Sequence, residues 1–244
     1  MNIAGGNAKG ERSKTGVSGL DEVLNGGFIP HRLYLLDGNP GAGKTTLSLQ
    51  YLLEGVKAGE KCLYITLSET KEAGQVRVQQ VDPAELSPGE FACLVRASVE
   101  QDKARVVVID SLNGYMYAMP EEKYLTAQLH ELLTYLGRQG VTTLLVVAQH
   151  GMVGTNMLSP VDTSYLADSV VLLCYFEYAG KVKKAISVVK KRSGAHEQSI
   201  RELQFDGKGI HLSEPLTQFR GILTGVPVES KSAENDAIRE PRKL

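Results

Sequence analysis

The stretch of sequence that decides the fold is Gly38-Asn39-Pro40-Gly41-Ala42-Gly43-Lys44-Thr45. It matches the pattern G-x-x-x-x-G-K-[ST], in which a glycine-rich loop surrounds phosphate groups. A short apolar run at residues 33–36 precedes the loop and predicts a buried strand. Residues 46–58 carry apolar side chains at helical spacing and predict a helix, which Gly59 ends. A strand, a glycine loop and a helix in this order are the context that a P-loop requires.

The loop predicts a binding site for a nucleoside triphosphate. Glycines allow the backbone to curl so that successive N–H groups converge on phosphate oxygens. The positive end of the following helix dipole adds to the attraction. We expect Lys44 to contact the β- and γ-phosphates and the Thr45 hydroxyl to bind Mg²⁺. The residues expected to hold the nucleotide are Gly38, Asn39, Pro40, Gly41, Ala42, Gly43, Lys44, Thr45 and Thr46.

Composition and charge limit the classes of protein to consider. The chain has 244 residues, 42% of them hydrophobic, so it can bury a substantial core as one domain. Its formal net charge of −1 gives no bulk attraction to nucleic acid or to an anionic membrane. The longest apolar runs are too short to span a bilayer, and residues 1–6 lack a signal-peptide pattern. We therefore expect a cytoplasmic protein without a membrane partner, and nucleic acid is not an expected partner.

The sequence predicts three parts. Residues 1–14 are polar and contain glycines, so we expect a mobile tail. Residues 15–228 form one α/β domain, and residues 229–244 form a disordered charged tail. The three cysteines stand apart from one another and outside any C-x-x-C pair, which predicts buried free thiols: Cys62, Cys93 and Cys174.

Two further predicted strands end close to acidic residues. An apolar run at residues 61–67 is followed by Ser68-Glu69, and a β-branched run at residues 106–110 ends in Asp110. Ligands of open α/β sheets bind beyond the carboxyl ends of the strands. Asp110 therefore has the position of a carboxylate that holds the water shell of Mg²⁺. Glu69 is either a catalytic residue beside the P-loop or a solvated loop carboxylate.

The connection after residues 61–67 is unusually short. Residues 76–81 alternate as a strand does, and only residues 70–75 separate them from the preceding strand and its polar end. A parallel crossover needs a dozen residues or more. Either this strand is not a parallel neighbour of the previous one, or part of the chain is missing at this point.

The remaining pattern alternates helices and strands. Helices are predicted at residues 89–101 and 121–139, with residues 113–120 as a loop between them. Strands are predicted at residues 142–148, 170–176, 185–190, 200–205 and 210–212. Gln149 follows one of these strands, where it could sense the γ-phosphate or make a plain strand-end hydrogen bond.

A basic segment, Lys190-Lys191-Arg192-Ser193-Gly194-Ala195-His196, lies just past a predicted strand. A charge run of this kind is usually a solvated turn. In a P-loop protein without another arginine finger in view, it can also reach the triphosphate of a neighbouring copy.

Taken in order, these motifs resemble a KaiC-type ATPase of the RecA superfamily over residues 13–228. The matching pieces are Thr15-Gly16-Val17-Ser18-Gly19-Leu20-Asp21 with Gly26-Gly27, the P-loop, Leu67-Ser68-Glu69-Thr70, residues 106–111 and the basic segment. The resemblance implies an α/β fold with a RecA-like P-loop core, in which helices flank a mostly parallel sheet and β-hairpin strands follow on the C-terminal side. It implies ATP and Mg²⁺ as ligands and a homo-hexamer or other homo-oligomer with ATP between subunits. Lys190, Arg192 and His196 match family residues that reach the adjacent subunit's nucleotide.

The resemblance predicts a regulatory or signalling ATPase with Glu69, Lys44, Lys190 and Arg192 as catalytic residues. The family typically has two adjacent glutamates where this chain has Ser68 and Glu69. Either Glu69 works alone or hydrolysis is slow. Many relatives also carry two such domains, whereas this chain has one. The alternatives are an ATP-controlled interaction module with little hydrolysis, a self-phosphorylating kinase and, least supported by the near-neutral charge, a RecA-like recombinase.

Overall fold

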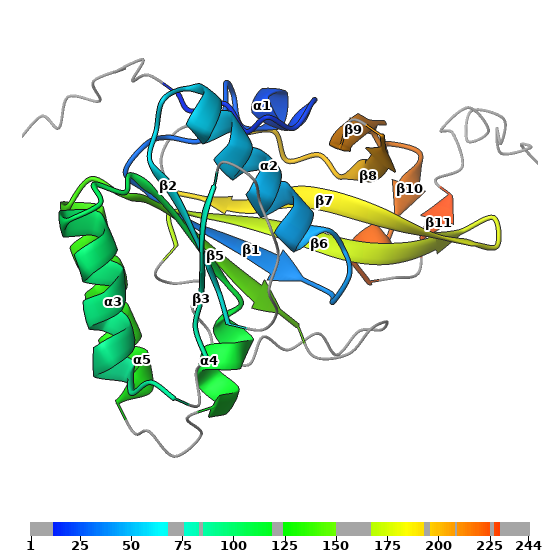
Figure 1. The fold of residues 1–244 in the computed structure, drawn as a ribbon. Helices are drawn as coiled ribbons and strands as arrows, with labels where there is room; N and C mark the ends of the chain where they lie inside the picture. The colour runs from blue at the N-terminus through cyan, green and yellow to red at the C-terminus, as the bar shows by residue number, and fades with distance from the viewer. Residues whose placement is uncertain are drawn as a thin grey trace, which may run out of the picture.

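The structure is a computed structural model, and it describes residues 12–67, 76–82, 85–118, 124–149, 167–192, 196–207, 209–224 and 227–229. Within these residues it has an α/β fold around a nine-stranded sheet with the strand order β3-β2-β4-β5-β1-β6-β7-β8-β9 (Figure 1). The fold class expected from the sequence is therefore confirmed. None of the helices in this part of the chain is long and apolar enough to cross a membrane.

The first six strands of the sheet are parallel, and the last three are added as antiparallel hairpins. The parallel strands are β1 (Leu33–Gly38), β2 (Cys62–Thr66), β3 (Arg77–Gln80), β4 (Val106–Asp110), β5 (Thr142–Ala148) and β6 (Ser169–Tyr178). The antiparallel strands are β7 (Lys181–Lys191), β8 (Arg201–Asp206) and β9 (Gly209–Pro215). A small second sheet pairs β10 (Phe219–Arg220) with β11 (Val228–Glu229), and the 3₁₀ helix η1 (Ile222–Thr224) lies between them.

Helices cover both faces of the sheet because its strands are apolar on both sides. Along β1, Tyr34 and Leu36 pack into one core cluster, and Leu35 packs into another on the opposite face. The first cluster includes residues of α1 (Leu20–Val23) and α2 (Lys44–Lys57). The second includes residues of α3 (Pro88–Glu100), α4 (Leu112–Ala118) and α5 (Leu125–Arg138). This alternation is the two-residue period of a strand buried on both faces.

Strand pairing brings the predicted site residues to one edge. β1 lies between β5 and β6, and Gly38 at its end is level with Ala148 of β5. Asp110 at the end of β4 is level with Val146 of β5 and Thr66 of β2. The P-loop, Asp110 and Gln149 therefore lie at the carboxyl edge of the same parallel strands, where such sheets bind ligands.

The structure decides the pairing of the segment at residues 76–81. β3 pairs with β2 in parallel, with Leu63 level with Arg77 and Thr66 level with Gln80. The alternative that denied a parallel pairing is therefore wrong. β3 is an edge strand of four residues, and all four pair with β2.

Two other expectations need correction. Residues 113–120 were expected to form a loop, but α4 occupies residues 112–118 and buries Leu112 and Tyr115 in the core. Gly114 lies where α4 comes close to the end of β2, since a Cβ there would lie 2.9 Å from the carbonyl oxygen of Leu67. Cys93 is exposed on α3, while Cys62 and Cys174 are buried as expected, and all three are free. Cys93 lies on the solvent side of its helix because the buried stripe runs through other positions, Phe91 and Val95 among them.

Candidate functional site

The backbone of the P-loop has a shape that only glycines allow. Gly41 and Gly43 have φ angles of 73° and 117°, which L side chains rarely adopt. A Cβ on Gly38 would lie 1.8 Å from the carbonyl oxygen of Leu173 in β6. A Cβ on Gly43 would lie 2.7 Å from the ring of Phe205 in β8. The loop glycines therefore serve both the curl of the loop and its close packing against the antiparallel strands.

No side chain caps the N-terminus of the helix that follows the loop. α2 begins at Lys44 with Gly43 as N-cap, and its first turn carries no acidic residue. The first N–H groups of a helix have no partner within the helix, and the helix dipole makes this end positive. This arrangement favours an anion such as a phosphate group.

Lys44 is a buried ammonium group that contacts its own loop. Its Nζ donates hydrogen bonds to the carbonyl oxygens of Gly38 and Asn39 at 2.8 and 2.7 Å. Only 6% of the residue is exposed. Burial lowers the pKa of Lys44 to about 8, and the nearby carboxylates of Asp110 and Asp37 oppose this shift. The site therefore holds a partly desolvated cation among the groups expected to contact phosphate.

The predicted Mg²⁺ ligands lie in direct contact. The Thr45 hydroxyl donates to Asp110 Oδ2 at 2.5 Å, and the Tyr64 hydroxyl donates to the same oxygen at 2.8 Å. Burial and the neighbouring Asp110 raise the pKa of Tyr64, so this phenol stays protonated and acts as a donor. Mg²⁺ prefers oxygen ligands and usually takes only one or two protein carboxylates beside phosphate and water. Thr45 and Asp110 fit that role, and a bound Mg²⁺ would neutralise charge on the phosphate oxygens.

Gln149 makes a strand-end hydrogen bond. Its Nε2 donates to Asp37 Oδ2 at 3.1 Å. Within the described part of the chain, Gln149 Oε1 and Asp37 Oδ1 are buried without a hydrogen-bond partner. Burial raises the pKa of Asp37 above its ordinary value, and the hydrogen bond from Gln149 opposes this shift. The geometry shows the plain hydrogen bond, and a role of Gln149 in sensing the γ-phosphate stays a prediction.

Four residues at the site were not identified from the sequence. Asp37 and Tyr64 contact Gln149 and Asp110 as described above. The Asn113 side chain makes two hydrogen bonds of 2.7 Å with the backbone of Ala148, which ties α4 to β5. The Tyr175 hydroxyl donates to the carbonyl oxygen of Pro40 at 3.1 Å and supports the loop from β6. A polar residue that ends an apolar strand was a signal for Asp37, but the other three depend on contacts far apart in sequence.

Lys190 and Lys191 of the basic segment lie at the end of the sheet opposite to the P-loop. Lys191 is level with Ser169 of β6, and Ser169 is level with Tyr34 of β1. Gly38 lies four residues further along β1, which corresponds to about 13 Å at the rise of a strand. Lys190 and Arg192 are therefore separated from Lys44 of the same chain, and His196 contacts the carbonyl oxygen of Val188 at 3.0 Å. Glu69 and residues 193–195 lie outside the described residues.

Comparison with known proteins places the chain in a family. The family model described as "ATPase: KaiC" matches residues 13–87 and 75–217. The two matched segments overlap at residues 75–87, which include β3. The chain belongs to the KaiC ATPase family. The match agrees with the RecA-like fold and with the ATP-binding motifs read from the sequence.

Individual relatives are distant in sequence. The chain is 24% identical to circadian clock protein KaiC3 of Synechocystis sp. over 93% of its own length and 48% of that protein. It is 25% identical to circadian clock oscillator protein KaiC of Thermostichus vulcanus, over 88% and 45% of the two chains. It is 27% identical to a UPF0273 protein of Thermotoga maritima, over 82% and 95%. The chain thus spans about half the length of the KaiC relatives that it matches.

Proposed function

We propose that this protein is a Mg²⁺-dependent ATPase that acts as a homo-oligomer, with each nucleotide at a boundary between two copies. Lys44 and the loop N–H groups hold the phosphates, and Thr45 and Asp110 hold Mg²⁺. Glu69 orients or activates the attacking water. Lys190 and Arg192 of the neighbouring copy stabilise the charge that develops in the transition state, and His196 contacts the same nucleotide.

One observation carries the proposal that the site is split between copies. In a single chain the P-loop lies at the carboxyl edge of β1, and Lys191 is level with Tyr34 near its start. This separation supports a site that the basic segment of another copy completes. In a head-to-tail contact, one surface of a copy packs against a different surface of the next copy. Such a contact brings the two edges together.

Removal of the P-loop lysine tests the ATPase assignment. In Lys44→Ala the loop loses the cation that contacts the phosphates, so we expect phosphate release from ATP to fall to background. Lys57→Ala is the matched control, because Lys57 lies at the far end of α2 and only pairs with Glu54 on the surface. Unchanged turnover in Lys44→Ala would refute the assignment.

A second candidate is an interaction module that binds ATP with little hydrolysis. It is favoured by Ser68, which stands where the family typically has the first of two glutamates. Parallel measurement of ATP binding and phosphate release separates the two functions. Binding with a turnover close to the uncatalysed rate, unchanged in Glu69→Gln, supports the second candidate against the first.

A further inference from the structure

The basic segment is attached to α1 on both of its sides. Before the segment's middle residues, the Lys191 ammonium donates to the carbonyl oxygen of Leu24 at 3.0 Å. After them, the backbone N–H of Glu197 donates to the carbonyl oxygen of Val23, also at 3.0 Å. The C-terminal end of α1 thus accepts hydrogen bonds from both flanks. The carbonyl groups at the end of a helix have no partner within it, so they are available to accept these hydrogen bonds.

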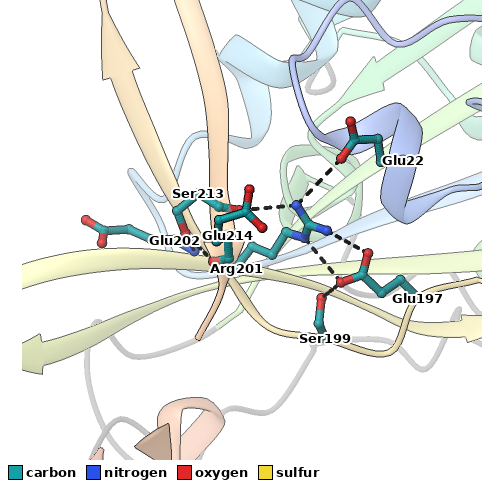
Figure 2. A network of polar contacts seen from close by, with 7 residues as sticks. All are labelled: Glu22, Glu197, Ser199, Arg201, Glu202, Ser213 and Glu214. Atoms are coloured by element: carbon teal, nitrogen blue, oxygen red, sulfur yellow. Dashed lines mark hydrogen bonds and ion pairs between the residues drawn. The ribbon is translucent and has the colours of Figure 1, made fainter. Parts of the chain in front are cut away.

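A buried arginine strengthens this attachment. Figure 2 shows Arg201 of β8 between Glu197 on one side and Glu22 of α1 on the other. Arg201 Nη2 and Nε donate to the two carboxylate oxygens of Glu197 at 2.7 and 3.3 Å, and Nη1 lies 3.9 Å from Glu22 Oε2. Nη1 also donates to the carbonyl oxygen of Ser213 at 3.3 Å. The Arg201 side chain is only 9% exposed, so its guanidinium group is oriented by these partners.

The charge on Glu197 is part of the same network. Hydrogen bonds from Arg201 and then from Ser199 hold the pKa of Glu197 below its ordinary value. A planar guanidinium group that binds both oxygens of a carboxylate restricts the orientation of both side chains. This contact therefore restricts the backbone that leads away from His196.

The surface that receives the basic segment is held to the rest of the fold by hydrogen bonds and by burial. We call residues 20–24 the α1 platform. The backbone N–H and the hydroxyl of Thr15 both donate to Asp21 Oδ1 at 2.8 Å, and Leu20, Val23 and Leu24 are buried in the core. Ser13 and Phe28 form an isolated antiparallel bridge. Gly27 lies beside it where a side chain does not fit, since a Cβ would lie 2.3 Å from the Ser13 carbonyl oxygen. Thr15, Asp21 and Gly27 belong to the motif at residues 15–21 and 26–27 that resembles the family. The nucleotide site proposed within one chain does not assign a function to this motif.

We propose that Arg201 and Glu197 are positioning residues that hold the basic segment on the α1 platform, so that it can complete the nucleotide site of a neighbouring copy. The proposal rests on the function proposed above. It assigns the N-terminal motif a role at the boundary between copies, at the end of the sheet remote from the P-loop. A preorganised cation stabilises a transition state without reorganising at the moment of reaction, whereas a mobile one loses much of that effect.

Two variants test the positioning role. Glu197→Gln keeps the volume of a partly exposed side chain, and Arg201→Lys keeps the buried charge but loses the planar donor. We expect both to lower kcat roughly ten- to a hundredfold, since small displacements of catalytic groups have effects of this size. We expect the Kd for ATP to change much less than kcat, because the P-loop that holds the phosphates is intact. Glu202→Gln is the matched control, because Glu202 follows Arg201 on β8 and the change breaks only its ion pair with Lys183 of β7, away from the α1 platform.

Mixing experiments distinguish positioning from general stabilisation. When Glu197→Gln or Arg201→Lys subunits are mixed with Lys44→Ala subunits, the intact P-loop of one meets the intact basic segment of the other, and we expect activity to return. The Arg192→Ala and Lys44→Ala mixture is the reference.

The outcomes separate this inference from the function on which it rests. Recovery in the reference mixture without recovery in the Glu197→Gln mixture overturns the inference alone. No recovery in the reference mixture overturns the split site and the inference with it. An unchanged kcat in folded Glu197→Gln overturns the inference whatever happens to Arg201→Lys.

Discussion

Lys44 connects burial with nucleotide binding at the scale of a single residue. Its ammonium group contacts two loop carbonyl groups and lies near two carboxylates, yet burial lowers its pKa to about 8. Phosphate groups would favour the charged form, so the pKa of Lys44 rises when ATP binds. The protein must therefore take up a proton on binding whenever the free lysine is neutral.

This linkage predicts a dependence of ATP binding on pH. Below about pH 8 Lys44 is charged in both states and contributes no dependence. Above this value we expect the affinity to fall by up to about tenfold per pH unit, until the pKa of the complex is reached. Calorimetry at about pH 9 in two buffers of different ionisation enthalpy measures the uptake of nearly one proton per site. Binding without proton uptake at that pH would contradict the linkage.

Tyr64 orients the carboxylate that is proposed to hold Mg²⁺. Its hydroxyl donates to the same oxygen of Asp110 as the Thr45 hydroxyl does. In Tyr64→Phe this donor is lost, and we expect half-maximal phosphate release to require about tenfold more Mg²⁺. Tyr34→Phe removes a buried hydroxyl that bonds only the Ile29 backbone and serves as the control. The same Mg²⁺ requirement in Tyr64→Phe and the control would show that Tyr64 does not orient Asp110.

α3 shows how an element can be stabilised apart from the site. Ser87 caps it by accepting a hydrogen bond from the backbone of Glu90, and the Glu90 side chain accepts one in return from the backbone of Ser87. Pro88 occupies the first turn, where its missing N–H costs nothing. This reciprocal arrangement begins a helix that packs against α5, on the second core cluster.

The cap predicts a loss of stability without a loss of activity. Ser87→Ala removes the side-chain acceptor, and we expect the free energy of unfolding to fall by about 1 kcal/mol while ATP turnover stays unchanged. Ser87→Asp retains an acceptor at the same position and should keep the wild-type stability. Denaturant unfolding of the three proteins measures the difference. Equal stability of Ser87→Ala and wild type would refute the role of the cap.

Elements with strong local patterns could be predicted from the sequence, and those that depend on distant contacts could not. The apolar run at residues 106–110 and the run at residues 142–148 match β4 and β5 at both ends, because a doubly buried strand is apolar throughout. α4 was missed because Asn113-Gly114 suggests a turn. Asn113 stabilises the helix through the backbone of Ala148, 35 residues away, and this contact leaves no local pattern.

The same limit applies to the site. The P-loop and Asp110 follow strands and could be placed from motif and order alone. Tyr64 could not, because its hydroxyl reaches Asp110 only after β2 and β4 pair. The parallel pairing of β3 with β2 was also not predicted. The usual length of a parallel crossover is only a tendency, and the return to a strand of four residues is short.

At the scale of the whole molecule, the two functional regions face different ends of one sheet. The carboxyl edge of β1, β4 and β5 carries the P-loop, Asp110 and Gln149. The other end carries the basic segment, held on the α1 platform by Lys191, Glu197 and Arg201. Under the proposed function each end supplies half of a nucleotide site, and a head-to-tail contact between copies would join the two halves.

The split site is tested most directly by mixing two inactive variants. Lys44→Ala lacks the phosphate-binding cation, and Arg192→Ala lacks the cation supplied to a neighbour, so each homo-oligomer should release little phosphate. In a random equimolar mixture, roughly a quarter of the boundaries combine an intact P-loop with an intact basic segment. We predict that turnover returns to about this fraction of the wild-type value. Turnover that stays at background in oligomers shown to contain both variants would contradict the account.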